Sequence, residues 1–483
     1  MTSHDTQSMQ SVTEEEEQVK QEPRYMHSVL QSIAGCILYS MDGFAISSTG
    51  SSLAMFKQNT NSENVKYVFT CRGFGYIFGA VATGSLFDAL NEKVHHNSQI
   101  SSTFLKTHCH SLWIIFSVIL LCSSMALMPL VSSVWLLLLL HLVMGFATGV
   151  LDSASHILCI WAWKHKSNTS AQPVVVSGIW QRLKGVLNGG SNAQSSTLKA
   201  WYNCVHLCFG VGALLCPLIM NVFQPIIIDA ETTSEQIASI YSRQRLTFMS
   251  LSILVASSLL FIPCYSLVRP VPKQKHQHHS SIKEQFIALV KEFWSRKGAT
   301  CLLLSISMTL LVGAQLCFGG VINSFVTDHG LGTDETANYV ASTYWSSITV
   351  MRFFCIPISY FVSSKVILIL SVVETIICMI ALGIWGKSSL TIVWIGTLLF
   401  GAGVSTQLPV ALAYPASIGM ELTGVMTTGV LVGGSIGDMT IPTLVSGIGT
   451  SYLFLVILIL MVSVLIVYVM MMLSAEVRLN RRV

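Results

Sequence analysis

The sequence predicts an all-α membrane protein of twelve transmembrane helices, arranged as two six-helix halves. Its 483 residues are 52% hydrophobic and only 10% charged, with a mean hydropathy of +0.63, which excludes a soluble globular protein. A membrane-spanning helix needs roughly 20 mainly apolar residues, and twelve segments meet or approach that length. They lie near residues 27–56, 66–90, 111–131, 134–161, 199–223, 246–268, 300–327, 335–362, 365–386, 390–417, 422–447 and 451–473.

The longest interior loop follows the sixth segment and divides the chain in two. We expect an N-terminal half at 27–268, a cytosolic linker at 269–299, a C-terminal half at 300–473, and cytosolic tails at 1–26 and 474–483, the first of them disordered. With this topology, 20 of the 27 basic residues lie in cytosolic segments and five on the opposite face. We therefore expect cytosolic termini and a monomer embedded in the lipid bilayer, with the plasma membrane as its location.

An internal repeat also favours two related halves. Gly212 in the fifth segment precedes a proline by five residues, as Gly437 does in the eleventh, and Gly145 in the fourth segment corresponds to Gly401 in the tenth. Transporters built from repeated halves carry such matches.

The fourth segment holds the sharpest polar pattern. Gly145, Gly149, Asp152 and His156 are spaced by four, three and four residues and therefore share one helical stripe. Glycines allow a neighbouring helix to approach closely, and a carboxylate at this depth costs about 3 kcal/mol unless it is paired or hydrated. Asp152 is the first candidate for a functional carboxylate, and structural pairing with His156 is the alternative.

Asp42 lies midway along the first segment and precedes a run of small, hydroxyl-bearing residues at 47–52. These hydroxyls could line a polar cavity. Burial of Asp42 would favour a proton site, whereas nearby oxygens would suit Na⁺. The residues do not decide between the two ions.

The second half offers groups that could recognise a sugar. On the eighth segment, Trp345 and Arg352 share a face with two hydroxyl residues, and Asp438 of the eleventh segment is one candidate partner for Arg352. Amides on the seventh and tenth segments, Gln315 and Gln407, can donate to and accept from hydroxyl groups. Such residues also tie transmembrane helices together, which is the alternative interpretation.

Enzyme chemistry has no support in the sequence. It contains no phosphate-binding glycine loop, no zinc-ligand spacing and no nucleophile with an adjacent base. We expect no enzyme, no cofactor beyond a coupling Na⁺ or H⁺, no resident metal and no nucleic-acid partner.

The stretch from Gly84 to Asp88, with Lys93 beyond it, resembles the loop signature of the major facilitator superfamily, although Asn91 and Glu92 depart from that pattern. In that family the aspartate caps a cytosolic charge network that holds one access state. The resemblance therefore assigns Gly84 and Asp88 to gating.

Further stretches keep their order along nearly the whole chain and look like the sodium-dependent glucose transporter-like branch, also called major facilitator domain-containing type four. They are 72–76, 149–152 with Trp161, His206 with 209–212 and Pro217, 342–345 with Arg352, and 423–424 with 434–437 and Pro442. The resemblance implies a twelve-helix fold, alternating access and hexose substrates. More distant fucose-proton symporters use carboxylates in the first and fourth helices, where Asp42 and Asp152 lie.

Together these observations predict a secondary transporter for a small polar solute, with a hexose such as glucose as the leading candidate, coupled to Na⁺ or H⁺. The predicted binding residues are Asp152, Asp42, His156, Gln315, Trp345, Arg352 and Gln407. Two alternatives stay open at this point. One is an uncoupled facilitator of another small organic solute, and the other is a non-transporting membrane receptor or scaffold of the same fold.

Overall fold

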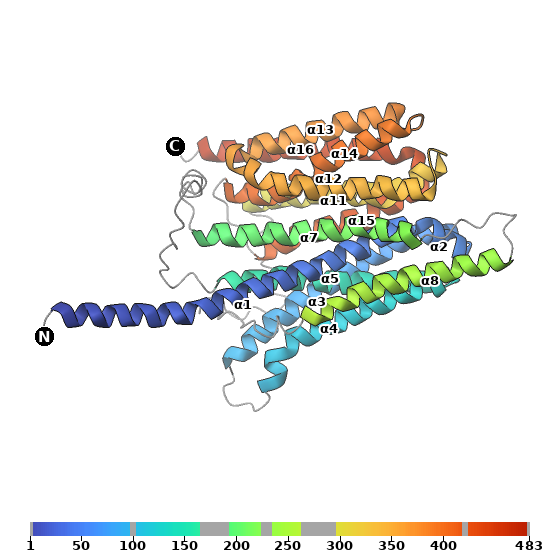
Figure 1. Ribbon diagram of the computed structural model, residues 1–483. Coiled ribbons are helices and arrows are strands. Elements are labelled where there is room, and N and C mark those ends of the chain that lie inside the picture. The colour runs from blue at the N-terminus through green and yellow to red at the C-terminus, as the bar shows by residue number, and fades with distance from the viewer. Residues whose placement is uncertain are drawn as a thin grey trace.

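The computed structural model describes residues 3–96, 103–164, 193–223, 234–261, 296–417 and 424–480. Within these ranges the chain is helical and has no strand. Twelve long helices run along one bundle (Figure 1), and they confirm the predicted fold class. Their bounds are α1 Ser3–Ser51, α3 Val68–His96, α4 Thr103–Leu127, α5 Val134–Lys164, α7 Ala193–Phe223, α8 Ser234–Ser257, α11 Arg296–Asp328, α12 Asp334–Phe361, α13 Ser364–Trp385, α14 Leu390–Ser417, α15 Gly424–Ile448 and α16 Leu453–Asn480.

Short elements connect these helices at one end of the bundle. They are α2 Leu53–Thr60, η1 Glu63–Tyr67, η2 Met128–Leu130 and η5 Thr450–Tyr452, whereas η4 Ser258–Phe261 continues α8 at the other end. The start of α1 and the end of α16 lie at the opposite end of the bundle (Figure 1). We refer to these as the connector end and the termini end.

Helix α1 extends farther than the sequence analysis expected. Helix α1 begins at Ser3 and projects beyond the bundle (Figure 1), within the range 1–26 where a disordered cytosolic tail was predicted; that disorder stays a prediction. The segment is rich in Glu and Gln, which are good helix formers. Its polarity therefore does not prevent helix formation.

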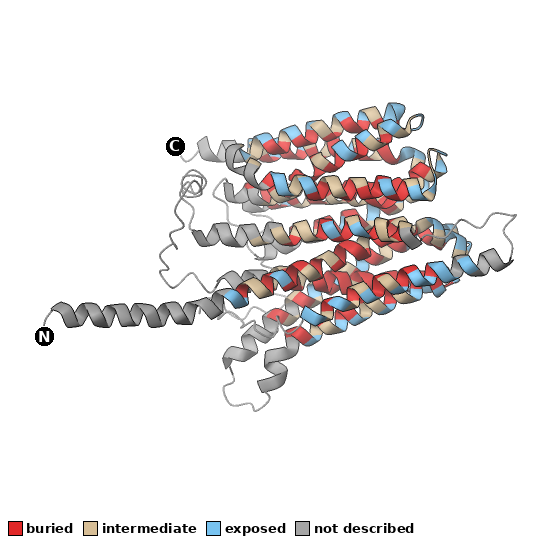
Figure 2. Ribbon diagram, viewed as in Figure 1, coloured by how far each residue is buried: buried red, intermediate tan, exposed pale blue. Residues whose placement is uncertain are grey.

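Nine of the described helices are long and apolar enough to cross a membrane. Large apolar side chains such as Trp135, Ile253 and Ile377 are exposed on them. Figure 2 shows exposed positions alternating with buried ones along α8 and α13, at opposite edges of the bundle. The remaining three long helices, α3, α12 and α15, carry the charged side chains of Arg72, Arg352 and Asp438. With nine candidate spans among its described residues, the chain is a multi-pass membrane protein.

Helix pairing repeats between the two halves. In the first, α1 packs on α7, α3 on α5 and α4 on α8, and in the second α11 packs on α15, α12 on α14 and α13 on α16. The two halves meet through α3 with α15, α7 with α12 and α1 with α11. Most of the linker predicted at 269–299 lies outside the described residues, so these domain boundaries stay a prediction.

Glycines at equivalent positions produce this repeated packing. A Cβ atom on Gly212 would clash with the backbone of Ser40 in α1, and one on Gly437 would clash with the backbone of Thr309 in α11. In the same way Gly145 meets the Arg72 backbone, and Gly401 meets the Tyr344 backbone. The four glycines predicted as a repeat therefore mark the closest helix approaches in corresponding helix pairs.

Candidate functional site

A cavity of about 140 Å³, with charged and polar side chains set among apolar ones, lies between the two halves. Both halves contribute to it, because α1, α3, α5 and α7 line it on one side and α11, α12, α14 and α15 on the other. The side chains on which the site is built are Tyr39, Asp42, Tyr76, Asp152, His156, His206, Gln315, Arg352 and Asp438. Five of the seven residues predicted to bind substrate or ion thus lie together on one cavity.

Asp152 is the best-coordinated carboxylate of the cavity. The Tyr76 hydroxyl donates a hydrogen bond to its Oδ2 atom. The Nδ1 atom of His156 lies 2.8 Å from Oδ1 of Asp152 and 2.9 Å from its backbone oxygen. The glycine stripe explains this geometry, because Gly149 lets the α3 backbone at Tyr76 approach α5 closely. As predicted, Gly149, Asp152 and His156 act from one face of the helix.

Asp42 is 2% exposed, and its Oδ1 atom has no hydrogen-bond partner among the described residues. The following hydroxyls do not complete a site around it. Ser48 donates to the backbone oxygen of Ala45, while Ser51 and Ser52 line a different cavity nearer the connector end. A buried carboxylate oxygen without a partner is costly, so it is suited to a ligand or a proton.

Two arginines on corresponding helices of the two halves are linked to the cavity, since Arg352 lines it and Arg72 pairs with Asp438, which lines it. Arg72 on α3 donates to Oδ1 of Asp438 on α15 at 2.6 Å, and both side chains are buried. Arg352 on α12 donates to the backbone oxygen of His206 on α7 at 2.8 Å. The suggested pairing of Arg352 with Asp438 is therefore wrong, because Arg72 occupies that carboxylate. Each arginine instead bridges the halves.

An aromatic group closes one side of the cavity. The rings of Tyr39, His156 and His206 lie 5.1 to 5.5 Å apart, centre to centre, and Phe209 lies 5.3 Å from Tyr39. Sequence reasoning did not select Tyr39, Tyr76 or His206 as site residues. Tyr39 could have been found, because it precedes Asp42 by three residues and so shares its helix face.

Two predicted binding residues do not line this cavity. Trp345 is 1% exposed and packs between Phe209 and Tyr344, with its ring edge against Gly319. Gln407 is fully buried, and its amide nitrogen lies 3.5 Å from the hydroxyl of Thr375 on α13, away from the other half. These two side chains serve helix packing in this structure, which was the alternative interpretation of such residues.

The predicted gating residues lie near the termini end of α3. Open space surrounds the Cα atom of Gly84 in the described part of the chain, since an added Cβ atom would meet nothing within 4 Å. The side chain of Asp88 lies outside the described residues, so its gating role stays a prediction.

No protein-family model matches the chain. Curated proteins do resemble it: the sodium-dependent glucose transporter 1A of Mus musculus is 21% identical over 409 residues, which cover 80% of this chain and 81% of that protein. The major facilitator superfamily domain-containing protein 4A of Mus musculus is 27% identical over 192 residues, which cover 38% of this chain and 37% of that protein.

Solved structures share the fold. A D-xylose-proton symporter superposes with a TM-score of 0.61 at 12% identity, covering 92% of this chain and 97% of that one. The transporter FucP in its outward conformation gives a TM-score of 0.60 at 14% identity, covering 92% and 99%. The chain therefore has the twelve-helix fold of major facilitator superfamily transporters, and its relatives are the sodium-dependent glucose transporters and the major facilitator superfamily domain-containing protein 4A.

Proposed function

We propose that this protein is a secondary active transporter that moves a hexose such as glucose across the membrane by alternating access. The observation that carries the proposal is the cavity between the halves, where Asp42 and Asp152 face Gln315 and Arg352. Carboxylates, an amide and a guanidinium can together hydrogen-bond several hydroxyl groups of one small solute. The names of the distant relatives, sodium-dependent glucose transporter, point to the same substrate class.

The central cavity must widen during the cycle. Its volume of about 140 Å³ is below the roughly 300–1,000 Å³ that ligand pockets usually have. Both arginine contacts cross between the halves next to it, so rocking of one half against the other would break them and open the site. We infer that this conformation is a closed stage of the cycle.

Asp152 is the proposed coupling carboxylate. A phenol O–H group and an imidazole nitrogen surround it, and these groups exchange protons with a carboxylate. Hard cations such as Na⁺ prefer a shell of oxygen atoms, so this arrangement favours H⁺ at Asp152. Asp42, whose Oδ1 atom is unpartnered in the described chain, is the second candidate for the coupling ion.

Reconstitution in proteoliposomes tests this function. We expect wild-type protein to exchange radiolabelled D-glucose in counterflow and to accumulate it when a pH or Na⁺ gradient is imposed separately. Asp152→Asn should abolish gradient-driven accumulation. Asp328→Asn is the matched control, because Asp328 is exposed at the end of α11, outside the cavity. Equal flux with both gradients collapsed would indicate a facilitator, and no counterflow across a panel of solutes would indicate a receptor or scaffold.

We propose in addition that the termini end faces the cytosol of a plasma-membrane protein that works as a monomer. The excess of basic residues in the segments assigned to that side supports this orientation. Labelling of a single introduced cysteine at Ser389, in the connector between α13 and α14, with an impermeant maleimide on intact cells tests it. Labelling without permeabilisation is expected, and labelling that requires permeabilisation would contradict the orientation.

A further inference from the structure

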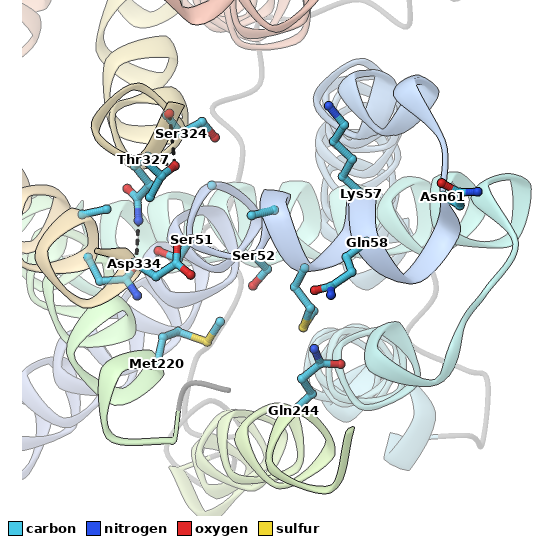
Figure 3. Close-up of a pocket in the computed structure, with 16 residues that line it drawn as sticks. Ser51, Ser52, Lys57, Gln58, Asn61, Met220, Gln244, Ser324, Thr327 and Asp334 are labelled. Atoms are coloured by element: carbon cyan, nitrogen blue, oxygen red, sulfur yellow. Dashed lines mark hydrogen bonds between the residues drawn. The ribbon is translucent and has the colours of Figure 1, made fainter. Parts of the chain in front are cut away.

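A second cavity, larger than the central one, lies nearer the connector end. It measures about 380 Å³ and is bordered by α1, α2, α7, α8, α11 and α12, and thus by both halves (Figure 3). We call it the vestibule. None of the residues that line it also lines the central cavity. It is therefore a separate compartment.

The two compartments follow one another along the same helices. On α11, Gln315 lines the central cavity and Asn323 lines the vestibule, eight residues farther along. On α1, Asp42 and Gly50 have the same separation. At 1.5 Å of rise per residue, both helices place the vestibule about 12 Å from the central cavity.

A narrow layer separates the vestibule from the central cavity. A Cβ atom on Gly50 of α1 would lie 2.7 Å from the Cα atom of Gly320 in α11, so the two backbones touch there. Phe69 packs beside Gly320, and Trp345 packs against the neighbouring Gly319. A solute coming from the connector end would meet this contact before it reached Asp42.

The lining of the vestibule combines apolar surface with uncharged hydrogen-bonding groups, and two charged residues, Lys57 and Asp334, also border it. Its amides and hydroxyls come from four helices and from the turn before α2, namely Gln58, Gln244, Asn323, Thr327 and Asn338 on the helices and Ser52 in the turn. Gln58 of α2 and Gln244 of α8 point toward each other (Figure 3). The ammonium of Lys57 is 2.8 Å from Glu63, which neutralises it. Such a lining suits a neutral solute with many hydroxyl groups.

Two buried polar atoms in this lining lack partners. The side-chain oxygens of Asn323 and Ser52 are buried and make no hydrogen bond to any described residue. Asn323 is 7% exposed and Ser52 is 1% exposed. The Asn323 amide is held in place, because its nitrogen donates to Asn338 Oδ1 at 2.5 Å, which fixes the free oxygen as an acceptor. A hydroxyl group of a ligand would satisfy that oxygen.

We propose that the vestibule is a second, outer binding site for a neutral polyhydroxylated solute, occupied before the solute passes the Gly50–Gly320 contact. Its volume falls within the usual range of ligand pockets, whereas that of the central cavity in this conformation does not. The outer site takes the hexose class from the proposed function. The outer site also makes a separate prediction: the solute should still bind at the vestibule when the central site has been disabled.

Equilibrium binding of radiolabelled D-glucose to the purified full chain in lipid nanodiscs tests this site. We expect two glucose molecules per wild-type chain. The central variant Gln315→Ala with Arg352→Ala should keep one, bound at the vestibule. The vestibule variant Asn323→Ala with Gln244→Ala should weaken that outer binding about tenfold, the usual effect of losing hydrogen bonds to a ligand. The matched control is Asn64→Ala, since Asn64 is exposed at the same end and lies outside the vestibule lining.

A second vestibule variant tests the site in case the double variant Asn323→Ala with Gln244→Ala misfolds. Ala54 lies on the vestibule wall and is exposed, so Ala54→Trp fills the hollow and removes no hydrogen bond. It should also eliminate the outer binding in a protein that stays monodisperse. The outer site would be overturned if the wild-type chain bound only one glucose and the central variant bound none. That result would leave the proposed function intact. Glucose binding at the outer site without any binding at the central site would support the outer site and overturn the proposed function. No binding at either site would overturn the outer site and the proposed function together.

Discussion

The Arg72 guanidinium on α3 and the Asp438 carboxylate on α15 form a buried ion pair 2.6 Å long that joins the two halves of the protein across 366 residues of chain. Asp438 also lines the central cavity, and Arg72 donates a hydrogen bond to the backbone oxygen of Ile46, which lines it too. Because the pair joins the two halves beside the central cavity, movement of one half relative to the other would separate its two side chains.

Removing one partner of this pair should be far worse than removing both. Asp438→Asn leaves the buried Arg72 charge uncompensated, which costs about 3–5 kcal/mol in comparable buried pairs. The double variant Arg72→Met with Asp438→Leu should recover much of that stability without recovering transport. Thermal unfolding in detergent and glucose counterflow measure the two effects. Strictly additive losses of stability would show that the two residues are not coupled.

The Tyr76 hydroxyl should tune the coupling carboxylate without being required for solute exchange. Tyr76→Phe removes the hydrogen bond donated to Asp152 and keeps the ring. We expect counterflow within about threefold of wild type, because one hydrogen bond to a charged group is lost from a network that keeps His156. Gradient-driven accumulation should fall more strongly, with a shifted pH profile. An unchanged profile would show that Tyr76 has only a packing role.

Gln315 and Gln407 should behave differently, although both are buried amides on helices of the second half. Gln315→Ala should raise the concentration for half-maximal glucose exchange about tenfold, because Gln315 lines the central cavity. Gln407→Met should leave it unchanged, because its contact is with Thr375 on α13. If Gln407→Met also weakened apparent affinity, the site would have to extend into α14.

The glycine contacts between α3 and α5 should tolerate no side chain. Gly145→Ala and Gly149→Ala place a methyl group against the backbone of α3 and should each destabilise the protein by about 1–3 kcal/mol. Gly383→Ala in α13 is the control, because nothing in the described chain lies within 4 Å of its new Cβ atom. That variant should be neutral or slightly more stable. Unfolding temperatures of the three proteins in one detergent provide the comparison.

A disulfide across the halves should arrest the cycle. Asn338 on α12 donates to Asn221 on α7 at 2.9 Å, so Asn221→Cys with Asn338→Cys can bridge the halves near the connector end. Oxidation should stop counterflow, and reduction should restore it. The pair Asp328→Cys with Thr450→Cys joins α11 to η5 within one half, outside both cavity linings, and should crosslink without stopping exchange. Continued transport by the inter-half crosslink would argue against rocking.

Local spacing predicted the parts of the site that one helix can encode. Asp152 and His156 share a face because they are four residues apart, and the same rule would have revealed Tyr39 beside Asp42. The partners of the arginines could not be found in this way, because the Arg72 contact depends on how α3 crosses α15. Gln407 shows the converse limit: a buried amide in a spanning helix has the same sequence signature whether it faces a cavity or another helix.

The buried charge of Arg72 on α3 has a consequence for biosynthesis. Arg72 emerges from the ribosome long before Asp438, its only ion-pair partner among the described residues. Helix α3 must therefore wait beside other early helices, with its charge unneutralised, until α15 is made. Final burial of that charge needs the last part of the chain, so a truncated product would expose it to membrane quality control. The ion pair thus ties the final packing of α3 to the presence of α15.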